Sequence, residues 1–133
     1  MISIELISFS FKSKNIPEAN YIFDVRFLNN PFYVDELREL TGLDKEVITF
    51  FENDTTTQGF LLKFLEWSRY LITHNLKANK EKIVIAIGCT GGQHRSPYIT
   101  ERLGKCLIGD TDISELTIYH RELKKYNVAL TEK

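Results

Sequence analysis

The stretch Ile83-Val84-Ile85-Ala86-Ile87-Gly88-Cys89-Thr90-Gly91-Gly92-Gln93-His94-Arg95-Ser96 determines how the rest of the chain is interpreted. An apolar run leads into a glycine, small and polar residues follow, and an apolar-periodic segment begins at Pro97. This order predicts a buried strand, a glycine-rich turn and the start of a helix. Because such a turn can direct several backbone N–H groups at one point, beside the positive end of a helix dipole, it is typical of an anion site.

The side chains around this turn suit a phosphate. Gly91 and Gly92 allow positive φ and a close approach of the backbone to a ligand. The Arg95 guanidinium can bind two phosphate oxygens at once, and His94 is a further donor. A plain strand-to-helix turn with a solvated arginine needs the glycines but not the other polar residues. The predicted ligand residues of this loop are Cys89, Thr90, Gly91, Gly92, His94, Arg95 and Ser96.

A second interpretation of the same loop is catalytic. From Cys89 to Ser96 the sequence fits Cys-x-x-Gly-x-x-Arg-Ser, which resembles the phosphate loop of cysteine-dependent phosphatases. Cys89 would then be the nucleophile and Asp24 would protonate the leaving group. Two features depart from that pattern: Gly88 stands where those enzymes usually carry histidine, and the sequence has no Trp-Pro-Asp segment. A Walker A motif for ATP hydrolysis is also absent from the sequence.

Hydrophobic periodicity divides the rest of the chain into alternating strands and helices. Strands are predicted at 2–9, 21–25, 83–87 and 116–120. Helices are predicted at 34–40, from an Asp44 cap to Phe51, at 57–77 and at 96–108. The longest helix has an apolar stripe, interpreted as core, that includes Trp67. The polar segment from Arg121 to Lys133 is predicted to fray.

This order predicts an α/β fold for a single domain over residues 1–133: a single mixed, mostly parallel sheet of about four strands with helices packed on it. In such sheets ligands bind outside the carboxyl ends of the strands. Polar clusters follow the first two strands as well as the third, so Lys12, Asp24 and Arg26 join the predicted site. The alternative for Asp24 and Arg26 is an ion pair that only shapes the turn.

Composition limits the function classes. The 133 residues are 43% hydrophobic and 26% charged, with no apolar run near the roughly 20 residues that span a bilayer. The N-terminus does not resemble a signal peptide, and two cysteines do not make a disulfide framework, so we expect a cytoplasmic protein. No residue spacing indicates a metal site, and no cofactor is predicted. The net charge of −1 lacks the basic excess of a duplex-binding domain.

Four segments, taken in order, resemble a known family. They are Ser8 to Lys12, Phe23 to Pro31, Glu36 to Asp44 and Ala86 to Ser96. Together they resemble the C-terminal domain of the RNase adapter protein RapZ and its relatives, over about residues 4–125. The resemblance implies binding of an amino-sugar phosphate, glucosamine 6-phosphate, and of a small regulatory RNA that the family presents to an endoribonuclease. It implies that the phosphate is held by Thr90, Gly91, Gly92, His94 and Arg95, and that Asp24 and Arg26 complete the pocket.

Several features differ from the family pattern. The family's N-terminal nucleotide-binding P-loop domain has no counterpart in this sequence, so nucleotide binding of that kind is not carried over. Ser10 replaces a usual glycine, and Phe32 stands where some relatives have histidine, which leaves the ligand's identity open. Lys124 and Lys125 are basic, but with a net charge of −1 they give the RNA role less support.

The sequence therefore predicts a binding domain rather than an enzyme. It would recognise a small phosphorylated metabolite and pass the signal to a partner, RNA or a regulatory protein, as a homo-oligomer without contact to a membrane. An RNA-binding adaptor without a metabolite and a phosphatase that uses Cys89 and Asp24 are the two alternatives.

Overall fold

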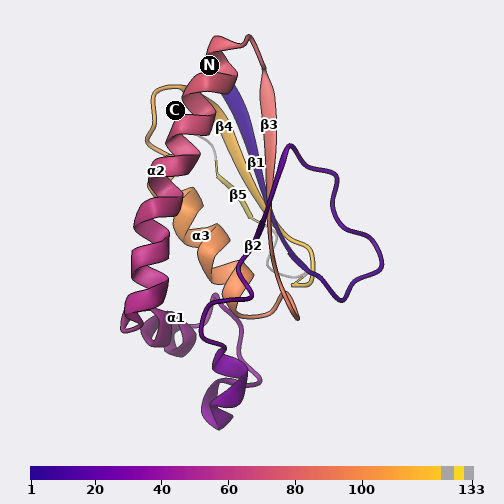
Figure 1. Ribbon diagram of the computed structural model, residues 1–133, viewed down its shortest axis with the longest axis vertical. Coiled ribbons are helices and arrows are strands. Elements are labelled where there is room, and N and C mark those ends of the chain that lie inside the picture. Colours follow the sequence, from indigo (N-terminus) through magenta and orange to yellow (C-terminus); the bar gives the residue numbers. More distant parts are fainter. Residues whose placement is uncertain (124–127, 131–133) are drawn as a thin grey trace.

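A five-stranded sheet forms the centre of the computed structural model, which describes residues 1–123 and 128–130. The strands lie in the order β2-β3-β1-β4-β5 (Figure 1). Their bounds are Ile2–Ser10 for β1, Tyr21–Asp24 for β2, Lys82–Cys89 for β3, Ile113–His120 for β4 and Val128–Leu130 for β5.

Parallel pairing joins the first four strands. β1 pairs with β3 on one side and with β4 on the other, and β2 pairs with β3. The short β5 pairs with β4 in the antiparallel direction. The predicted α/β fold with a mixed, mostly parallel sheet is therefore confirmed, and the fifth strand adds to the predicted four.

Helices lie between β2 and β3 and between β3 and β4 along the chain, and they cover one face of the sheet (Figure 1). They are the 3₁₀ turns η1 at Pro31–Tyr33 and η2 at Asp35–Leu37, and the α-helices α1 at Lys45–Glu52, α2 at Thr55–Lys77 and α3 at Arg95–Leu107. Asp44 precedes α1 as predicted, although its carboxylate accepts a hydrogen bond from the Thr41 N–H instead of capping the helix. The Asp54 carboxylate does cap α2, through the N–H and hydroxyl of Thr57.

The main hydrophobic core lies between this helical layer and the sheet. Alternate residues of β1 and β3, such as Leu6 and Ile85, pack with Phe64 of α2 and Leu103 of α3. The opposite face is covered by a smaller cluster around Phe9 and Ala86, against which Phe11 and Ala19 of the loop after β1 pack. In Figure 1 this loop extends away from the helices, so the sheet has a thick covering on one face and a thin one on the other.

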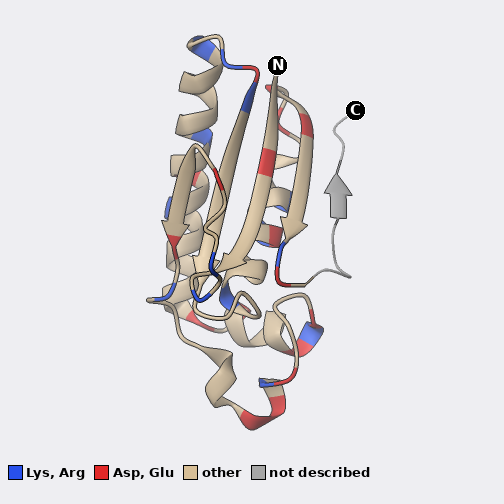
Figure 2. Cartoon of the chain, turned by 90° about the vertical axis from the view of Figure 1, so that its right-hand side faces the viewer, with Lys and Arg blue, Asp and Glu red and all other residues tan. Residues whose placement is uncertain are grey.

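Charged residues lie mostly outside these layers. Figure 2 shows Lys, Arg, Asp and Glu on loops and on the outer surfaces of helices, while the strands are largely uncharged. None of the helices in residues 1–123 combines the length and the apolar character that crossing a bilayer requires. Within the described residues, no three His, Cys, Asp or Glu side chains come together as they would around a metal ion.

The predicted helix at 34–40 is wrong. Only η2 forms there, and Val34 before it is extended, with φ −103° and ψ 116°. The backbone carbonyls of this segment are bonded from elsewhere: Leu37 O by the His94 ring, and Arg38 O and Leu40 O by the Gln93 carboxamide. These long-range hydrogen bonds replace the bonds that would continue a helix.

Two further differences concern α2 and the C-terminus. Trp67 was expected in the core but is 47% exposed, since it lies on the outer side of α2 and stacks on Tyr70. The predicted frayed end from Arg121 is wrong where β5 forms. Residues 124–127 and 131–133, with Lys124 and Lys125, lie outside the described residues.

Two glycine substitutions test how closely α3 packs on the sheet. A Cβ at Gly104 of α3 would lie 2.5 Å from the Ile118 Cδ1 of β4, whereas a Cβ at Gly59 of α2 would meet nothing within 4 Å. We expect Gly104→Ala to lower the free energy of unfolding by about 1–3 kcal/mol through overpacking. Gly59→Ala should raise it by about 0.5–1 kcal/mol, because alanine is the better helix former. Urea unfolding of both variants measures this, and equal effects would contradict the close packing.

Candidate functional site

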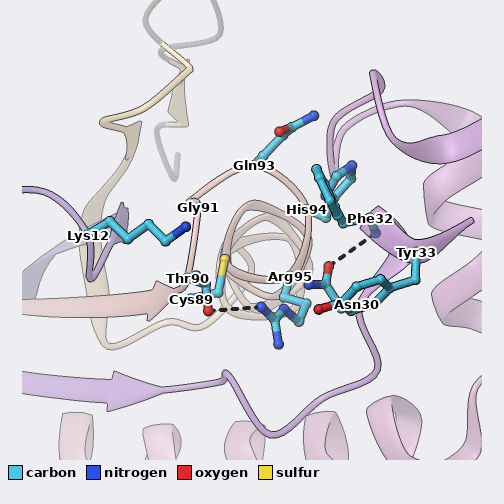
Figure 3. Close-up of a pocket in the computed structure, with 10 residues that line it drawn as sticks. All are labelled: Lys12, Asn30, Phe32, Tyr33, Cys89, Thr90, Gly91, Gln93, His94 and Arg95. Atoms are coloured by element: carbon cyan, nitrogen blue, oxygen red, sulfur yellow. Dashed lines mark hydrogen bonds between the residues drawn. The ribbon is translucent and has the colours of Figure 1, made fainter. Parts of the chain in front are cut away.

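A cavity opens where three parallel strands end. The carboxyl ends of β1, β2 and β3 lie at one edge of the sheet because Ser10 pairs with Cys89 and Asp24 pairs with Gly88. The cavity has a volume of about 220 Å³ (Figure 3). It is lined by Lys12, Asn30, Phe32, Tyr33, Cys89, Thr90, Gly91, Gln93, His94 and Arg95.

The loop between β3 and α3 consists of residues 90–94, and its backbone N–H groups are potential donors to a ligand. In the part of the chain that the structure describes, no N–H of residues 90–95 donates to a protein acceptor. The next N–H, that of Ser96, donates to the Cys89 sulfur at 3.3 Å. Backbone donors in folded proteins are nearly always satisfied, so a run of free ones around a cavity indicates an anion or ordered water as the partner.

The conformation of this loop is fixed from behind. Gly92 has φ +67°, which favours glycine. A Cβ at this position would also lie 2.4 Å from the Glu122 Cγ and 3.1 Å from the backbone of Phe9. The Ser10 hydroxyl donates to the Thr90 carbonyl oxygen at 2.6 Å. The loop is therefore held against the end of β1.

Gln93 and His94 join the loop to the segment after η1. The Gln93 carboxamide donates to Arg38 O at 2.8 Å and to Leu40 O at 2.7 Å. The buried His94 ring donates from Nε2 to Leu37 O at 2.9 Å. Burial lowers the pKa of His94 below its usual 6.5, and the neighbouring backbone carbonyls oppose that shift only partly. His94 is therefore a neutral side chain at pH 7 whose Nε2 proton is already donated to the protein.

Arg95 lines the cavity and also holds the chain that follows β2. Its Nη1 donates to the carbonyl oxygens of Arg26 at 2.6 Å and Leu28 at 3.2 Å, and its Nη2 donates to the Thr90 hydroxyl at 3.3 Å. A guanidinium has five N–H donors. The Nε–H and the second Nη2 hydrogen have no acceptor among the described residues. Arg95 is thus a buried residue that holds the chain after β2 and also lines the cavity.

Cys89 lies at the base of the loop. Its sulfur lies 3.2 Å from the Ser96 hydroxyl, and the residue is 2% exposed. Gly88 precedes it because a Cβ there would lie 2.5 Å from the Phe9 ring and 2.6 Å from the Phe11 ring. The two phenylalanine rings therefore occupy the space that the histidine of the phosphatase pattern would need.

Asp24 and Arg26 lie outside this cavity and bind each other. The Arg26 Nη2 donates to the Asp24 carboxylate at 2.7 Å, and both side chains are nearly half exposed. The Arg26 guanidinium also lies over the Phe11 ring, 4.2 Å from its centroid. The hydrogen bond from Arg26 lowers the pKa of Asp24. Asp24 is therefore ionised at neutral pH, whereas a general acid must be protonated there.

Of the other predicted ligand residues, Lys12 lines the cavity and two do not, and the sequence analysis missed some lining residues. Lys12 is exposed and extends its ammonium toward the loop (Figure 3). Gly92 and Ser96 support the loop from below and do not line the cavity. The missed lining residues are Asn30, Phe32, Tyr33 and Gln93. The Asn30-Pro31 turn in the connection after β2 is the signal that could have indicated the first three, since this connection starts at the same sheet edge.

Comparison with known proteins identifies the family. The sequence model described as the RapZ C-terminal domain matches residues 2–124. The chain belongs to the RapZ C-terminal domain family. It is 46% identical over 124 residues to a nucleotide-binding protein of Lactobacillus acidophilus. The aligned region covers 93% of this chain and 41% of that protein.

Two other relatives match this chain with similar identity and coverage. The chain is 46% identical to a nucleotide-binding protein of Lactobacillus helveticus, over 93% of this chain and 42% of that protein. It is 42% identical to a nucleotide-binding protein of Listeria welshimeri, over 94% and 42%. The chain thus spans about two fifths of the length of these relatives.

The buried His94 of this RapZ-type domain predicts a pH dependence of stability. Since its pKa is lower in the folded chain than its usual 6.5, the unfolded chain binds the proton more tightly. Stability from His94 is therefore complete above about pH 6.5 and is lost as the pH falls toward the folded pKa. We expect His94→Gln to reduce the slope of unfolding free energy between about pH 7 and 5, measured by urea unfolding. Parallel pH profiles for the two proteins would contradict the argument.

Proposed function

We propose that this domain binds a small phosphorylated metabolite at the loop of residues 90–94 and performs no chemistry on it. The observation that carries the proposal is the run of backbone N–H groups from 90 to 95 that have no acceptor within residues 1–123 and 128–130. A phosphate has enough oxygens to accept several of these donors at once. The hydrogen bonds of Gln93 and His94 to the carbonyl oxygens of residues 37–40, and that of Ser10 to the Thr90 carbonyl, keep the loop preorganised.

Two cationic side chains and two aromatic rings in the cavity lining support a sugar phosphate as the ligand. The Lys12 ammonium and the Arg95 guanidinium provide positive charge beside the loop amides. Asn30, Phe32 and Tyr33 form the other side of the cavity and offer an amide and two aromatic rings for the rest of the ligand. The family association with glucosamine 6-phosphate makes an amino-sugar phosphate the first ligand to test.

Binding explains the surroundings of Cys89 better than turnover does. The Asp24 carboxylate is bonded to Arg26, is ionised at neutral pH and does not line the cavity with Cys89. A phosphatase would need another acid within hydrogen-bonding reach of the leaving group. We therefore propose that Cys89 supports the loop through its contacts with Ser96 and is not a nucleophile.

The proposal also includes a macromolecular partner for the domain. The relatives carry the name nucleotide-binding protein, and they are more than twice as long as the matched region. We propose that the ligand-bound domain signals to RNA or to a regulatory protein, as the family resemblance implies, from a cytoplasmic homo-oligomer. A steep decrease of RNA affinity with salt concentration would support the RNA partner.

Lys12 and Lys14 provide a matched test of ligand binding. Both are exposed lysines of the loop after β1, but only Lys12 lines the cavity. Glucosamine 6-phosphate at about 100 times its Kd should raise the free energy of unfolding by about 2.7 kcal/mol. Lys12→Ala should weaken binding by about tenfold or more, because one charge-assisted contact is lost. Lys14→Ala should leave the affinity unchanged, as measured by calorimetry and thermal shift.

The proposal fails if no phosphorylated sugar stabilises the domain, or if both lysine variants bind like the wild type. Inorganic phosphate serves as the minimal probe of the loop itself. Inorganic phosphate should bind more weakly than the sugar phosphate, since it has no sugar ring to contact Asn30, Phe32 and Tyr33.

Cys89→Ser separates binding from catalysis. We expect this variant to keep its affinity for glucosamine 6-phosphate within about threefold, since serine preserves a hydrogen bond to Ser96. The wild-type protein should not hydrolyse para-nitrophenyl phosphate. Hydrolysis that disappears in Cys89→Ser would establish the phosphatase alternative instead.

A further inference from the structure

A second hollow adjoins the cavity at the sheet edge. It is wide and open, with a volume of about 690 Å³. Its lining residues are Asn29, Asn30, Tyr33, Phe50, Asn53 and Asp54. Asn30 and Tyr33 line both this hollow and the first cavity, so the two meet on either side of one short segment. A ligand larger than one ring can therefore extend from the loop of residues 90–94 across Tyr33 into the hollow.

Three carboxamides are held in place at the border of the hollow. Asn29 donates from Nδ2 to the carboxylate that caps α2 at 2.7 Å, and Asn53 donates from Nδ2 to a backbone carbonyl of α1 at 3.1 Å. Asn30 accepts a backbone N–H of η1 with its Oδ1 at 3.1 Å. Among the described residues, the Oδ1 of Asn29 and the Oδ1 of Asn53 therefore accept no hydrogen bond, and the Nδ2 of Asn30 donates none. Fixed donors and acceptors together suit hydroxyl groups, which both donate and accept.

Two aromatic rings complete this surface. Tyr33 is 79% exposed and lies between the two cavities, with its ring edge-to-face to that of Phe32 at 5.9 Å. Phe50 is partly buried and contacts the Phe51 ring at 5.3 Å, so its position is set by the core. An exposed aromatic ring beside fixed amides suits a sugar ring, because a pyranose has an apolar C–H face and a polar rim.

The charge of the two cavities differs. The first cavity contains Lys12 and Arg95. Among the residues that the structure describes, no Lys or Arg lines the hollow, and the one charged lining residue is Asp54, which already binds Asn29 and Thr57. A second phosphate would therefore be repelled there, and a neutral group is favoured.

We propose that the hollow is a second subsite that takes a neutral glycosyl unit attached to the phosphorylated ring bound in the first cavity. The ligand class is then a phosphorylated disaccharide or another glycosylated sugar phosphate. This inference rests on the proposed function, because the first cavity must hold the phosphate. Tyr33 and Asn30 connect the two rings of the ligand, and Asn53 and Phe50 contact only the second ring.

Calorimetry with matched ligands tests this subsite. The wild-type chain is titrated with glucose 6-phosphate, and with trehalose 6-phosphate and sucrose 6-phosphate, which each add one neutral ring. We expect at least one disaccharide phosphate to bind about tenfold tighter than glucose 6-phosphate, equivalent to one or two net hydrogen bonds. Asn53→Ala should bring the ratio of the two dissociation constants close to one. Glu52→Ala, a change of an exposed neighbour that lines neither cavity, should keep the wild-type ratio.

A second variant covers the case in which Asn53→Ala perturbs the end of α1. Tyr33→Ala removes an exposed ring and should reduce the ratio as well, whereas Tyr70→Ala on α2, also exposed, should not. The subsite is disproved if glucose or glucosamine 6-phosphate binds and neither disaccharide phosphate binds more tightly, or if the gain persists in Asn53→Ala and Tyr33→Ala. If no phosphorylated sugar binds at all, the proposed function fails with it.

Discussion

The parallel register of β1 and β3 is the constraint on which the site depends. The two strands stay paired up to their last residues, Ser10 and Cys89, so both chains leave the sheet at the same level. The Ser10 hydroxyl can then reach the Thr90 carbonyl, and Lys12 emerges beside the loop. A shift of the register by one residue would turn Ser10 to the other face and break this arrangement.

In the loop of residues 90–94 and the adjoining Arg95, side chains and backbone have different roles. Gln93, His94 and Arg95 donate to carbonyl oxygens of segments that follow β2. These side chains hold the neighbouring chain in place, while the backbone N–H groups of the same loop have no protein acceptor among the described residues. The loop is therefore rigid without using the donors that a ligand needs. Preorganised donors of this kind reduce the entropy lost on binding.

The strands and the loop were predictable from sequence because their signals are local. The apolar run into Gly88 and the glycines of the loop are both recognised from residues that are close neighbours in the sequence. The segment 34–40 was not predictable in the same way, since its carbonyls are bonded by Gln93 and His94, more than 50 residues away. Trp67 fits the apolar stripe of α2 in sequence, but its place on the helix is outside the contact with the sheet.

Only the part of the site that has local sequence signals was predicted. The loop and Lys12 follow strands directly, and their meeting depends only on parallel pairing. Phe32 and Tyr33 reach the cavity through the path of the chain after β2, which the clamp of Arg95 on the Arg26 and Leu28 carbonyls determines. Contacts of that kind depend on tertiary structure and leave no periodic pattern in the sequence.

The contact between Glu122 and Gly92 has a consequence for sequence variation in the family. The Glu122 Cγ fills the space where a side chain at position 92 would begin, and its carboxylate accepts the Ser10 N–H at 3.1 Å. Substitutions at these three positions are therefore coupled, although they lie far apart in the sequence. Residue 122 is expected to covary with residues 10 and 92 across related chains, and grafting the loop into another scaffold requires the acidic residue behind it as well.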